Sequence, residues 1–420
     1  MPINIAKRAI LQQIAHSIGR VPSLNPLSFG PRIMDLTGFM SPEQTQELQN
    51  RTLVVVQLSG GNDGINTLVP YSQQAYYNAR PTLMLDKSKV LQLNGDVALH
   101  PNMTGFKDLY DSGHMAIVQG VGYPNPNRSH YESMNIWQTA NPGTHTPTGW
   151  LGRYLDVAKS IDSSINAVDL DILLSPTLIG QQQRAMAVES LDTFRVRPLN
   201  RTPSSQSRSE QAIKALDSIQ CSSCQEYSSL VNAMVEAGLD AITASEIVQE
   251  AASNYQTSVV YPKNDFGNRL KLAAQIITSS LKPRIVFLQI GGFDTHANQK
   301  DTQANLLKTV SDGISAFFKD MESKDKANDT VLMTFSEFGR RVKENGSLGT
   351  DHGTAEPMFL FGGRVNGGLY GSYPSLTDLD SGDLRFTVDF RRVYSSVLQD
   401  WLGADSSRVL FSDFQKLNLF

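Results

Sequence analysis

The chain has 420 residues, of which 40% are hydrophobic and 19% are charged, a composition typical of a soluble globular protein that can bury a large core. The formal net charge of −4, without a long basic stretch, argues against a general nucleic-acid binder, so we expect no nucleic-acid partner. No apolar run approaches the ~18 residues that a membrane-spanning helix needs, and no transmembrane segment is predicted.

The N-terminal lead-in, residues 1–50, is unusual because its first 34 residues contain no acidic residue. Ile3, Ile10, Ile14 and Ile18 recur at helical spacing, which predicts an amphipathic helix. No uninterrupted apolar segment follows the basic residues, so this is not an ordinary secretory signal peptide. A transit peptide or a helix lying on the domain would both fit, and we favour the second. We assign residues 51–420 to a single domain.

The first strand prediction is Leu53–Leu58, and the loop after it carries two glycines and Asp63. The glycines lack the spacing of a dinucleotide-binding motif or of a P-loop. An aspartate at a strand's carboxyl end is a candidate metal ligand, although an Asp-Gly turn explains the same residues comparably well. We add the neighbouring Asn62 to the candidates for substrate binding.

A second strand is predicted at Met115–Val121, followed by a loop and a helix that runs on through Trp137. Ser129 and Glu132 have the spacing of a capping box at the start of that helix. A hydroxyl in the positive field of a helix N-terminus could also act as a nucleophile, so Ser129 is a candidate catalytic residue. Arg128 and His130 flank it and are included with it.

Residues 197–260 are predicted to form a flexible and helical insertion, because residues 197–226 are rich in Ser, Arg and Gln. The only two cysteines, Cys221 and Cys224, lie there. A single pair lacks the ligands of a four-cysteine zinc site, so an incidental or locally disulfide-bonded pair is favoured. A helix with one apolar face is expected after Asn264.

The stretch Ile285–His296 joins a continuous apolar strand to two glycines and then to Asp294 and His296. Alternate residues of an extended segment share a face, so these two side chains point the same way. A helix and a second apolar strand, Thr330–Phe335, follow and end at Glu337. Because a strand–helix–strand unit places its strands parallel, Glu337 emerges at the same sheet edge as Asp294.

Asp351 and His352 precede another strand, Met358–Phe361, and a last helix is expected near Asp389–Leu402 with Gly403 as its cap. Strand ends and adjacent loops of one sheet converge in space, which predicts a common site. Mixed carboxylate and imidazole ligands suit zinc or manganese better than calcium, and one or two ions are expected. The candidate metal ligands are Asp63, Asp294, His296, Glu337, Asp351 and His352; Arg128, Arg153 and Arg340 are candidates for binding an anionic group.

A series of motifs carries a family resemblance over roughly residues 53–403: LVVVQLSGGNDGINTLVPY, YYNARPTL, HMAIVQGVGYPNPNRSHYES, GWLGRYL, GGFDTHANQ, TFSEFGRR, TDHGTAEPMFLFGG, GGLYG and DFRRVYSSVLQDWLG. The chain resembles the uncharacterised domain family numbered 1501, a branch of the alkaline-phosphatase/sulfatase-like superfamily. The resemblance implies a three-layer α/β/α sandwich with a largely parallel central sheet. It also implies a metal-binding Asp63, a nucleophile at Ser129, metal ligands at Asp294 and His296, and a final ligand at His352.

The chain departs from that pattern where the superfamily has a further Asp-His pair, because it has Glu337-Phe338. The change removes one imidazole and lengthens a carboxylate by a methylene. A one-metal site, a rearranged pair joined by His130 or Asp351, and no metal at all therefore stay open.

We predict a metal-dependent hydrolase of a phosphate or sulfate ester, with a small-molecule anionic ester as its substrate. Ser129 or a metal-bound water would be the nucleophile, and a histidine would protonate the leaving oxygen. The alternative is a non-catalytic binding or envelope-assembly protein on a hydrolase-like scaffold. Members of the family commonly carry a twin-arginine export signal, but no apolar segment follows Lys7-Arg8. A periplasmic protein whose leader is missing and a cytoplasmic protein both stay open.

Overall fold

A computed structural model describes residues 47–158, 166–181, 185–188, 248–250 and 253–420. The predicted N-terminal helix lies outside the described residues. So do Cys221, Cys224 and most of the predicted insertion.

A nine-stranded sheet with the order β11-β5-β10-β9-β1-β8-β6-β7 forms the centre of the described structure, and β14 pairs with β5 beside this path. Strand β10 is antiparallel to both of its neighbours, whereas every other pairing in this sheet is parallel. The predicted largely parallel sheet is therefore confirmed. The strands are β1 (Thr52–Leu58), β5 (Met115–Gly122), β6 (Ala167–Asp169), β7 (Ala185–Ala187), β8 (Ile285–Ile290), β9 (Thr330–Phe335), β10 (Glu356–Gly362), β11 (Gly368–Tyr370) and β14 (Val388–Asp389).

The central strands form because their residues are apolar on both faces, and each face meets a separate core. All residues of β1 are buried; Val54 and Val56 belong to one hydrophobic cluster, while Leu53 and Val55 belong to the other. A strand covered on both sides needs this continuous apolar run rather than an alternating one.

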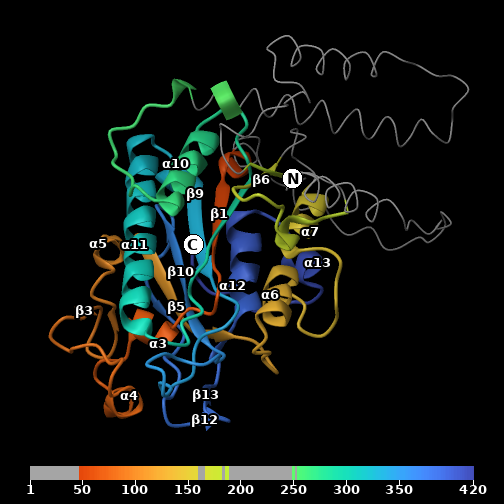
Figure 1. Ribbon diagram of the computed structural model, residues 1–420. Helices are drawn as coiled ribbons and strands as arrows, with labels where there is room; N and C mark the ends of the chain where they lie inside the picture. Colours follow the sequence, from red (N-terminus) through yellow and green to blue (C-terminus); the bar gives the residue numbers. More distant parts are fainter. Residues whose placement is uncertain (1–46, 159–165, 182–184, 189–247, 251–252) are drawn as a thin grey trace, which may run out of the picture. The chain divides into compact units, whose positions relative to one another are not determined.

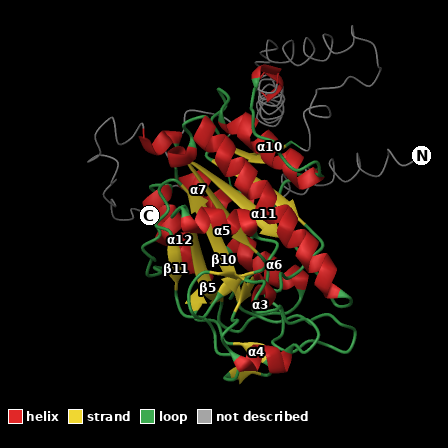
Figure 2. Cartoon of the chain, turned by 90° about the vertical axis from the view of Figure 1, so that its left-hand side faces the viewer, coloured by secondary structure: helices red, strands yellow, loops and turns green. Residues whose placement is uncertain are grey.

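Helices cover both faces of the sheet and complete the predicted three-layer α/β/α sandwich (Figures 1 and 2). One face carries α5 (Thr104–Asp111), α10 (Asp265–Ile277) and α11 (Gln299–Ser323). The other carries α6 (His130–Thr139), α7 (Trp150–Val157), α12 (Phe390–Ser396) and α13 (Ser406–Leu410). Among the described helices, none combines the length and the apolar character needed to cross a lipid bilayer.

Smaller elements lie around these layers. A three-stranded sheet has the order β2-β4-β3, and a separate hairpin pairs β12 with β13. A third hydrophobic cluster, which includes Tyr76 and Leu384, fills the space beneath them. These elements are α3 (Gly64–Thr67), α4 (Gln74–Ala79), β2 (Leu68–Val69), β3 (Leu91–Gln92), β4 (Ala98–Leu99), β12 (Leu379–Asp380), β13 (Asp383–Leu384), the 3-10 turns η2 (Pro176–Leu178) and η3 (Ala327–Asp329), and the π-helical turn η4 (Val397–Trp401).

The five predicted strands are confirmed, as are the helices after Asn264 and after Asp389. Asn264 caps α10 by accepting a 2.8 Å hydrogen bond from the Gly267 amide, and Gly403 follows the last helical turn with a φ of 70°. The predicted capping box is wrong. Ser129 is the N-cap residue of α6, but its side chain makes no capping hydrogen bond.

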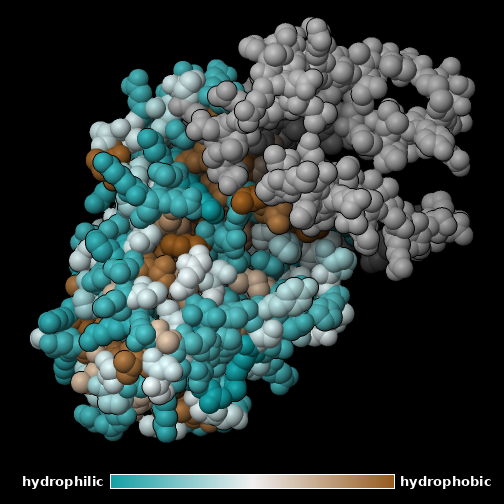
Figure 3. All heavy atoms as spheres, viewed as in Figure 1, coloured by the Kyte–Doolittle hydropathy of each residue, from teal (hydrophilic) through white to brown (hydrophobic). Residues whose placement is uncertain are grey.

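Strand direction brings the loops of interest to one edge of the sheet. The carboxyl ends of β1, β8 and β9 lie at that edge because these strands are parallel. Strand β10 runs the other way, so the loop that precedes it begins at the same edge. The lower part of the molecule in the space-filling view, where these loops lie, presents mainly hydrophilic residues (Figure 3).

Candidate metal centre

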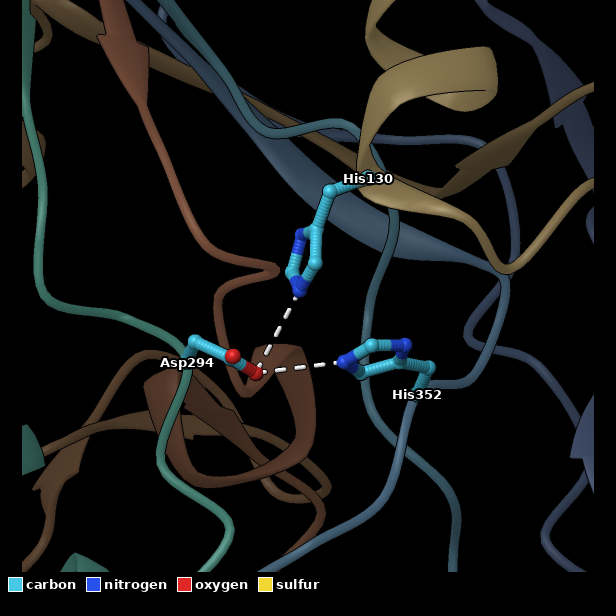
Figure 4. Close-up of side chains that lie close together, drawn as sticks. All are labelled: His130, Asp294 and His352. Atoms are coloured by element: carbon cyan, nitrogen blue, oxygen red, sulfur yellow. Dashed lines mark hydrogen bonds and ion pairs between the residues drawn. The ribbon is translucent and has the colours of Figure 1, made fainter.

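Three histidine rings face a single carboxylate oxygen, Oδ1 of Asp294, in the loop after β8. The Nε2 atoms of His130, His296 and His352 lie 3.4, 3.0 and 3.1 Å from that oxygen. His130 is the first residue of α6, and His352 lies in the loop before β10 (Figure 4). Segments that are far apart in the sequence therefore converge on one atom.

Glu337 sets the orientation of the His130 ring. The Nδ1 atom of His130 lies 2.6 Å from Oε1 of Glu337, and that oxygen also accepts a 2.9 Å hydrogen bond from the Gly60 amide. The other oxygen accepts a 3.1 Å hydrogen bond from the Ser336 hydroxyl, and Glu337 is only 1% exposed. In the neutral ring Nδ1–H donates to Glu337, so Nε2 keeps its lone pair on the side of Asp294. Glu337, a predicted metal ligand, therefore contacts the Nδ1 side of the His130 ring, whereas Asp294 faces the Nε2 side.

The other two rings are held in the same way. Nδ1 of His352 lies 2.8 Å from the backbone oxygen of Arg128, and Nδ1 of His296 lies 3.3 Å from Oδ1 of Asp351. A hydrogen bond from Asn345, together with the contact to His296, holds the pKa of Asp351 below its usual range. Each oxygen can accept a hydrogen bond from Nδ1–H, and a neutral ring in that tautomer presents an Nε2 lone pair to the centre.

The protonation states make this centre suitable for a cation. Burial raises the pKa of Asp294, but the 2.7 Å hydrogen bond from Arg340 and the charge of that guanidinium outweigh it, and the pKa falls to about 2. Burial lowers the pKa of His352, which favours its neutral form. An ionised carboxylate facing neutral imidazole lone pairs is an unfavourable arrangement unless a cation lies among them. Nε2 of His130 is buried and makes no hydrogen bond with the described residues.

The spacing and donor set also fit a metal ion. The candidate ligand atoms of His130, Asp294 and His352 all lie within 4.8 Å of one another, and Nε2 of His296 lies 2.9 Å from Nε2 of His352. Ligands about 2.1 Å from a tetrahedral zinc ion are about 3.4 Å apart, close to the spacings around Asp294. Nitrogen-rich ligand sets suit zinc or manganese better than calcium. The side chains of Asp294 and His296 are 46% and 45% exposed, so a further ligand could reach the centre.

Phe338 supports two of the three histidines. Its ring centroid lies 4.8 Å from those of both His130 and His352. A Cβ atom on Gly61, whose φ is 74°, would overlap the Phe338 ring, so this packing requires glycine. The Phe338 ring therefore packs against two imidazoles, at a position where the family resemblance implies a histidine.

Asp63, the other predicted strand-end ligand, lies in a different environment. It is fully buried and forms an ion pair with Arg80, which is also fully buried. Gln299 donates a hydrogen bond to the same carboxylate, and the Asn66 amide donates a 3.4 Å hydrogen bond as part of the α3 cap. Arg80 lies in the motif YYNARPTL, but its pairing with Asp63 is visible only in the folded chain.

Three of the predicted substrate-binding residues are buried and bonded to the protein itself. Oδ1 of Asn62 accepts hydrogen bonds from Thr67 (3.0 Å) and Gln303 (2.9 Å). The guanidinium group of Arg153 donates 2.6 Å hydrogen bonds to the carbonyl groups of Thr139, Thr148 and Val409. That of Arg340 donates to Asp294 and to the carbonyl groups of Gly60, Gly61, Phe293 and Thr350.

Ser129 and Arg128 lie at the rim of the centre, next to His130. Ser129 is exposed, and its amide donates a 2.8 Å hydrogen bond to Asn127. The Arg128 side chain is 39% exposed and forms an ion pair with the buried Asp383. Burial raises the pKa of Asp383, although the charge of Arg128 opposes that effect.

Comparisons with known proteins give one family match. The model of the family described as "Protein of unknown function (DUF1501)" matches residues 50–410. No curated protein matches the chain.

Solved structures with a similar chain course include the PsFucS1 sulfatase from Pseudoalteromonas sp., with 9% identity over 90% of this chain and 75% of that chain and a TM-score of 0.40. The lipoteichoic acid synthase LtaP from Listeria monocytogenes has 7% identity over 89% and 81% of the two chains, with a TM-score of 0.40. The C-terminal periplasmic domain of EcEptC from Escherichia coli, in complex with Zn, has 11% identity over 75% and 73%, with a TM-score of 0.35. These TM-scores are too low for the likeness to carry an argument about activity.

Proposed function

Because the chain belongs to the family of unknown function DUF1501, we propose an activity from its site alone: metal-dependent hydrolysis of a phosphate or sulfate ester. One observation carries the proposal. Three imidazoles, each held at Nδ1 by an oxygen acceptor, direct their Nε2 atoms to the ionised carboxylate of Asp294. This is the ligand and supporting-residue arrangement that a zinc-class ion requires.

Asp294, His130 and His352 would hold one divalent cation, zinc or manganese, with His296 as a further ligand. We infer one ion rather than two because a buried guanidinium already neutralises Asp63. When bound, the cation would neutralise charge on the ester oxygens and favour the ionised form of a nucleophile.

Ser129 and Arg128 would act on the substrate beside this ion. The Ser129 hydroxyl makes no capping hydrogen bond and lies at the N-terminus of α6, where an anionic oxygen is stabilised. It is therefore our candidate nucleophile, with water as the alternative. Arg128 is partly exposed and would contact the anionic group of the ester. We assign no substrate contact to the buried Asn62, Arg153 and Arg340.

The test combines metal analysis with turnover of aryl phosphates and aryl sulfates, after supplementation with zinc or manganese. We expect about one equivalent of metal per chain and hydrolysis of at least one ester class. Asp294→Asn should lose both, and Ser129→Ala should lose on the order of a hundredfold or more in kcat if the hydroxyl is the nucleophile. Asp312→Asn, a partly exposed Asp on α11 that pairs with Lys308, is the matched control and should change neither.

Two results would overturn the proposal. Less than about a tenth of an equivalent of metal would remove its physical basis. Metal bound without turnover of any ester would instead favour the non-catalytic binding protein.

A further inference from the structure

A cleft of about 410 Å³ lies next to the metal centre and plays no part in the arrangement described above. We propose that it binds the alcohol half of the ester, and that this alcohol is a neutral polyhydroxylated compound such as a sugar. The inference rests on the proposed function for the ester but concerns a separate surface. The volume falls within the range of about 300–1,000 Å³ typical of small-molecule sites.

The cleft and the metal centre share a loop. Gly291 lines the cleft, and Asp294 follows three residues later in the same loop. Ser59 also lines it, and the next residue, Gly60, packs so tightly on the Asp294 backbone that a Cβ atom there would lie 2.5 Å from the Asp294 nitrogen. The cleft therefore borders the loop that carries Asp294.

A fixed set of donors and acceptors lines the cleft. Nη2 of Arg269 lies 2.8 Å from Oδ2 of Asp265, and its Nη1 lies 3.7 Å from Oδ2 of Asp171. The Gln289 amide donates to Asp171 and accepts a 3.3 Å hydrogen bond from Gln57. These contacts hold the polar groups in place before a ligand arrives, which lowers the entropy cost of binding.

The charge of the lining selects the class of ligand. One guanidinium, from Arg269, faces two carboxylates, from Asp171 and Asp265, so the cleft carries a net negative charge. A second anionic group on the substrate would be repelled there. Amide, carboxylate and guanidinium groups above the apolar side chains of Phe266 and Ile290 instead suit the hydroxyl groups and C–H faces of a sugar ring.

Two exposed glycines, Gly291 and Gly292, lie in the loop that leads from the cleft to Asp294. A Cβ atom built on Gly291 meets no atom within 4 Å, so the space above this residue is open. A larger side chain can be introduced there without a clash, because the φ of Gly291 is not in the left-handed region. Gly291→Phe should therefore keep the fold and obstruct the part of the cleft that Gly291 lines.

The experiment measures equilibrium binding to metal-loaded protein by calorimetry. The non-hydrolysable phosphonate and sulfonate analogues of the glucose 6-esters and of the phenyl esters stand in for the esters, because the esters themselves would be turned over. We expect the glucose esters to bind about tenfold or more tightly than the phenyl esters. Gly291→Phe and Gln289→Ala should each remove about tenfold of that affinity and leave the phenyl esters within about twofold. Gly95→Phe is the matched control, since a Cβ atom on Gly95 also meets nothing within 4 Å, and it should change neither.

The outcomes separate the two proposals. Glucose esters that bind no more tightly than phenyl esters, or that bind both variants as tightly as the wild type, would overturn the cleft assignment even if phenyl esters are hydrolysed. Glucose esters that bind through the cleft without being hydrolysed would support it while the hydrolase proposal fails.

Discussion

At the scale of single residues, the oxygen atoms that contact Nδ1 of the three histidines determine what the centre can bind. An imidazole becomes a metal ligand at Nε2 only when Nδ1 carries the proton, and the oxygens beside Nδ1 fix that choice. Glu337 does this for His130 from a buried position with every oxygen hydrogen-bonded. In the proposed metal site, its carboxylate would orient a ligand rather than supply one.

Glu337→Gln tests that role. The amide has nearly the same shape but no charge, so it should hold Nδ1–H of His130 less firmly and weaken metal binding by about 10- to 100-fold. Competition with a fluorescent chelator measures the change. Glu356→Gln is the matched control, because Glu356 is also buried, burial raises its pKa well above the usual range, and it accepts a hydrogen bond from the Ser336 amide rather than from a histidine. An unchanged affinity in Glu337→Gln would contradict the orienting role.

Asp63→Asn tests whether the second strand-end carboxylate belongs to the metal centre. We expect about one equivalent of metal to be retained, as in the wild type. The free energy of unfolding should fall by about 3–5 kcal/mol, because Arg80 is left buried without its partner. Metal analysis and urea unfolding provide both readouts. Loss of the metal from a folded Asp63→Asn protein would make Asp63 a ligand after all.

The sequence could not distinguish Asp63 from Asp294, because both follow a buried strand and a pair of glycines. The difference lies in partners from remote segments. Arg80 reaches Asp63, whereas three histidines reach Asp294. A pattern of strand ends predicts which carboxylates share an edge, but it does not predict which side chains they face.

At the scale of elements, the strand predictions are confirmed because each run is mostly apolar and is followed by glycine or polar residues. The sequence does not indicate that β10 is antiparallel, because a strand buried on both faces has the same composition in either direction. Its direction nevertheless matters for the site. It places the loop with His352 at the edge where β8 delivers Asp294.

The end of strand β6 provides a pH-dependent prediction. Burial raises the pKa of Asp169, despite a hydrogen bond from the Ser175 amide, to about 7 from an ordinary value of 3.8. The folded state then binds more protons than the unfolded state between these values, so the free energy of unfolding falls as the pH rises through this window. Asp169→Asn keeps the shape without the charge, and it should be more stable than the wild type at about pH 8 by a few kcal/mol.

Urea unfolding at about pH 4.5 and pH 8, with a chelator present, measures this effect apart from any metal. The difference between Asp169→Asn and the wild type should nearly vanish at the lower pH, where the wild-type carboxyl is protonated in the folded protein. An equal difference at both values would show that Asp169 does not titrate in this range.

At the scale of the whole molecule, the centre brings together three segments that are far apart in the sequence and are positioned by the central sheet. His130 begins a helix on one face of the sheet, Asp294 follows a central strand, and His352 precedes the antiparallel strand. These contacts span more than half of the chain, which is why the residue types could be predicted from the sequence and their distances could not. A cation bound among them would link all three segments in the folded state.

Metal removal should therefore destabilise the protein. A ligand that binds only the folded state adds about 2.7 kcal/mol when its free concentration is a hundred times its dissociation constant. For a domain of this size we expect a chelator to lower the Tm of the metal-loaded protein by a few degrees. Asp294→Asn should show no such shift, because it lacks the carboxylate on which the three histidines converge. A Tm that does not respond to the chelator in metal-loaded wild type, or that responds equally in Asp294→Asn, would mean that the convergence of these side chains does not depend on a bound ion.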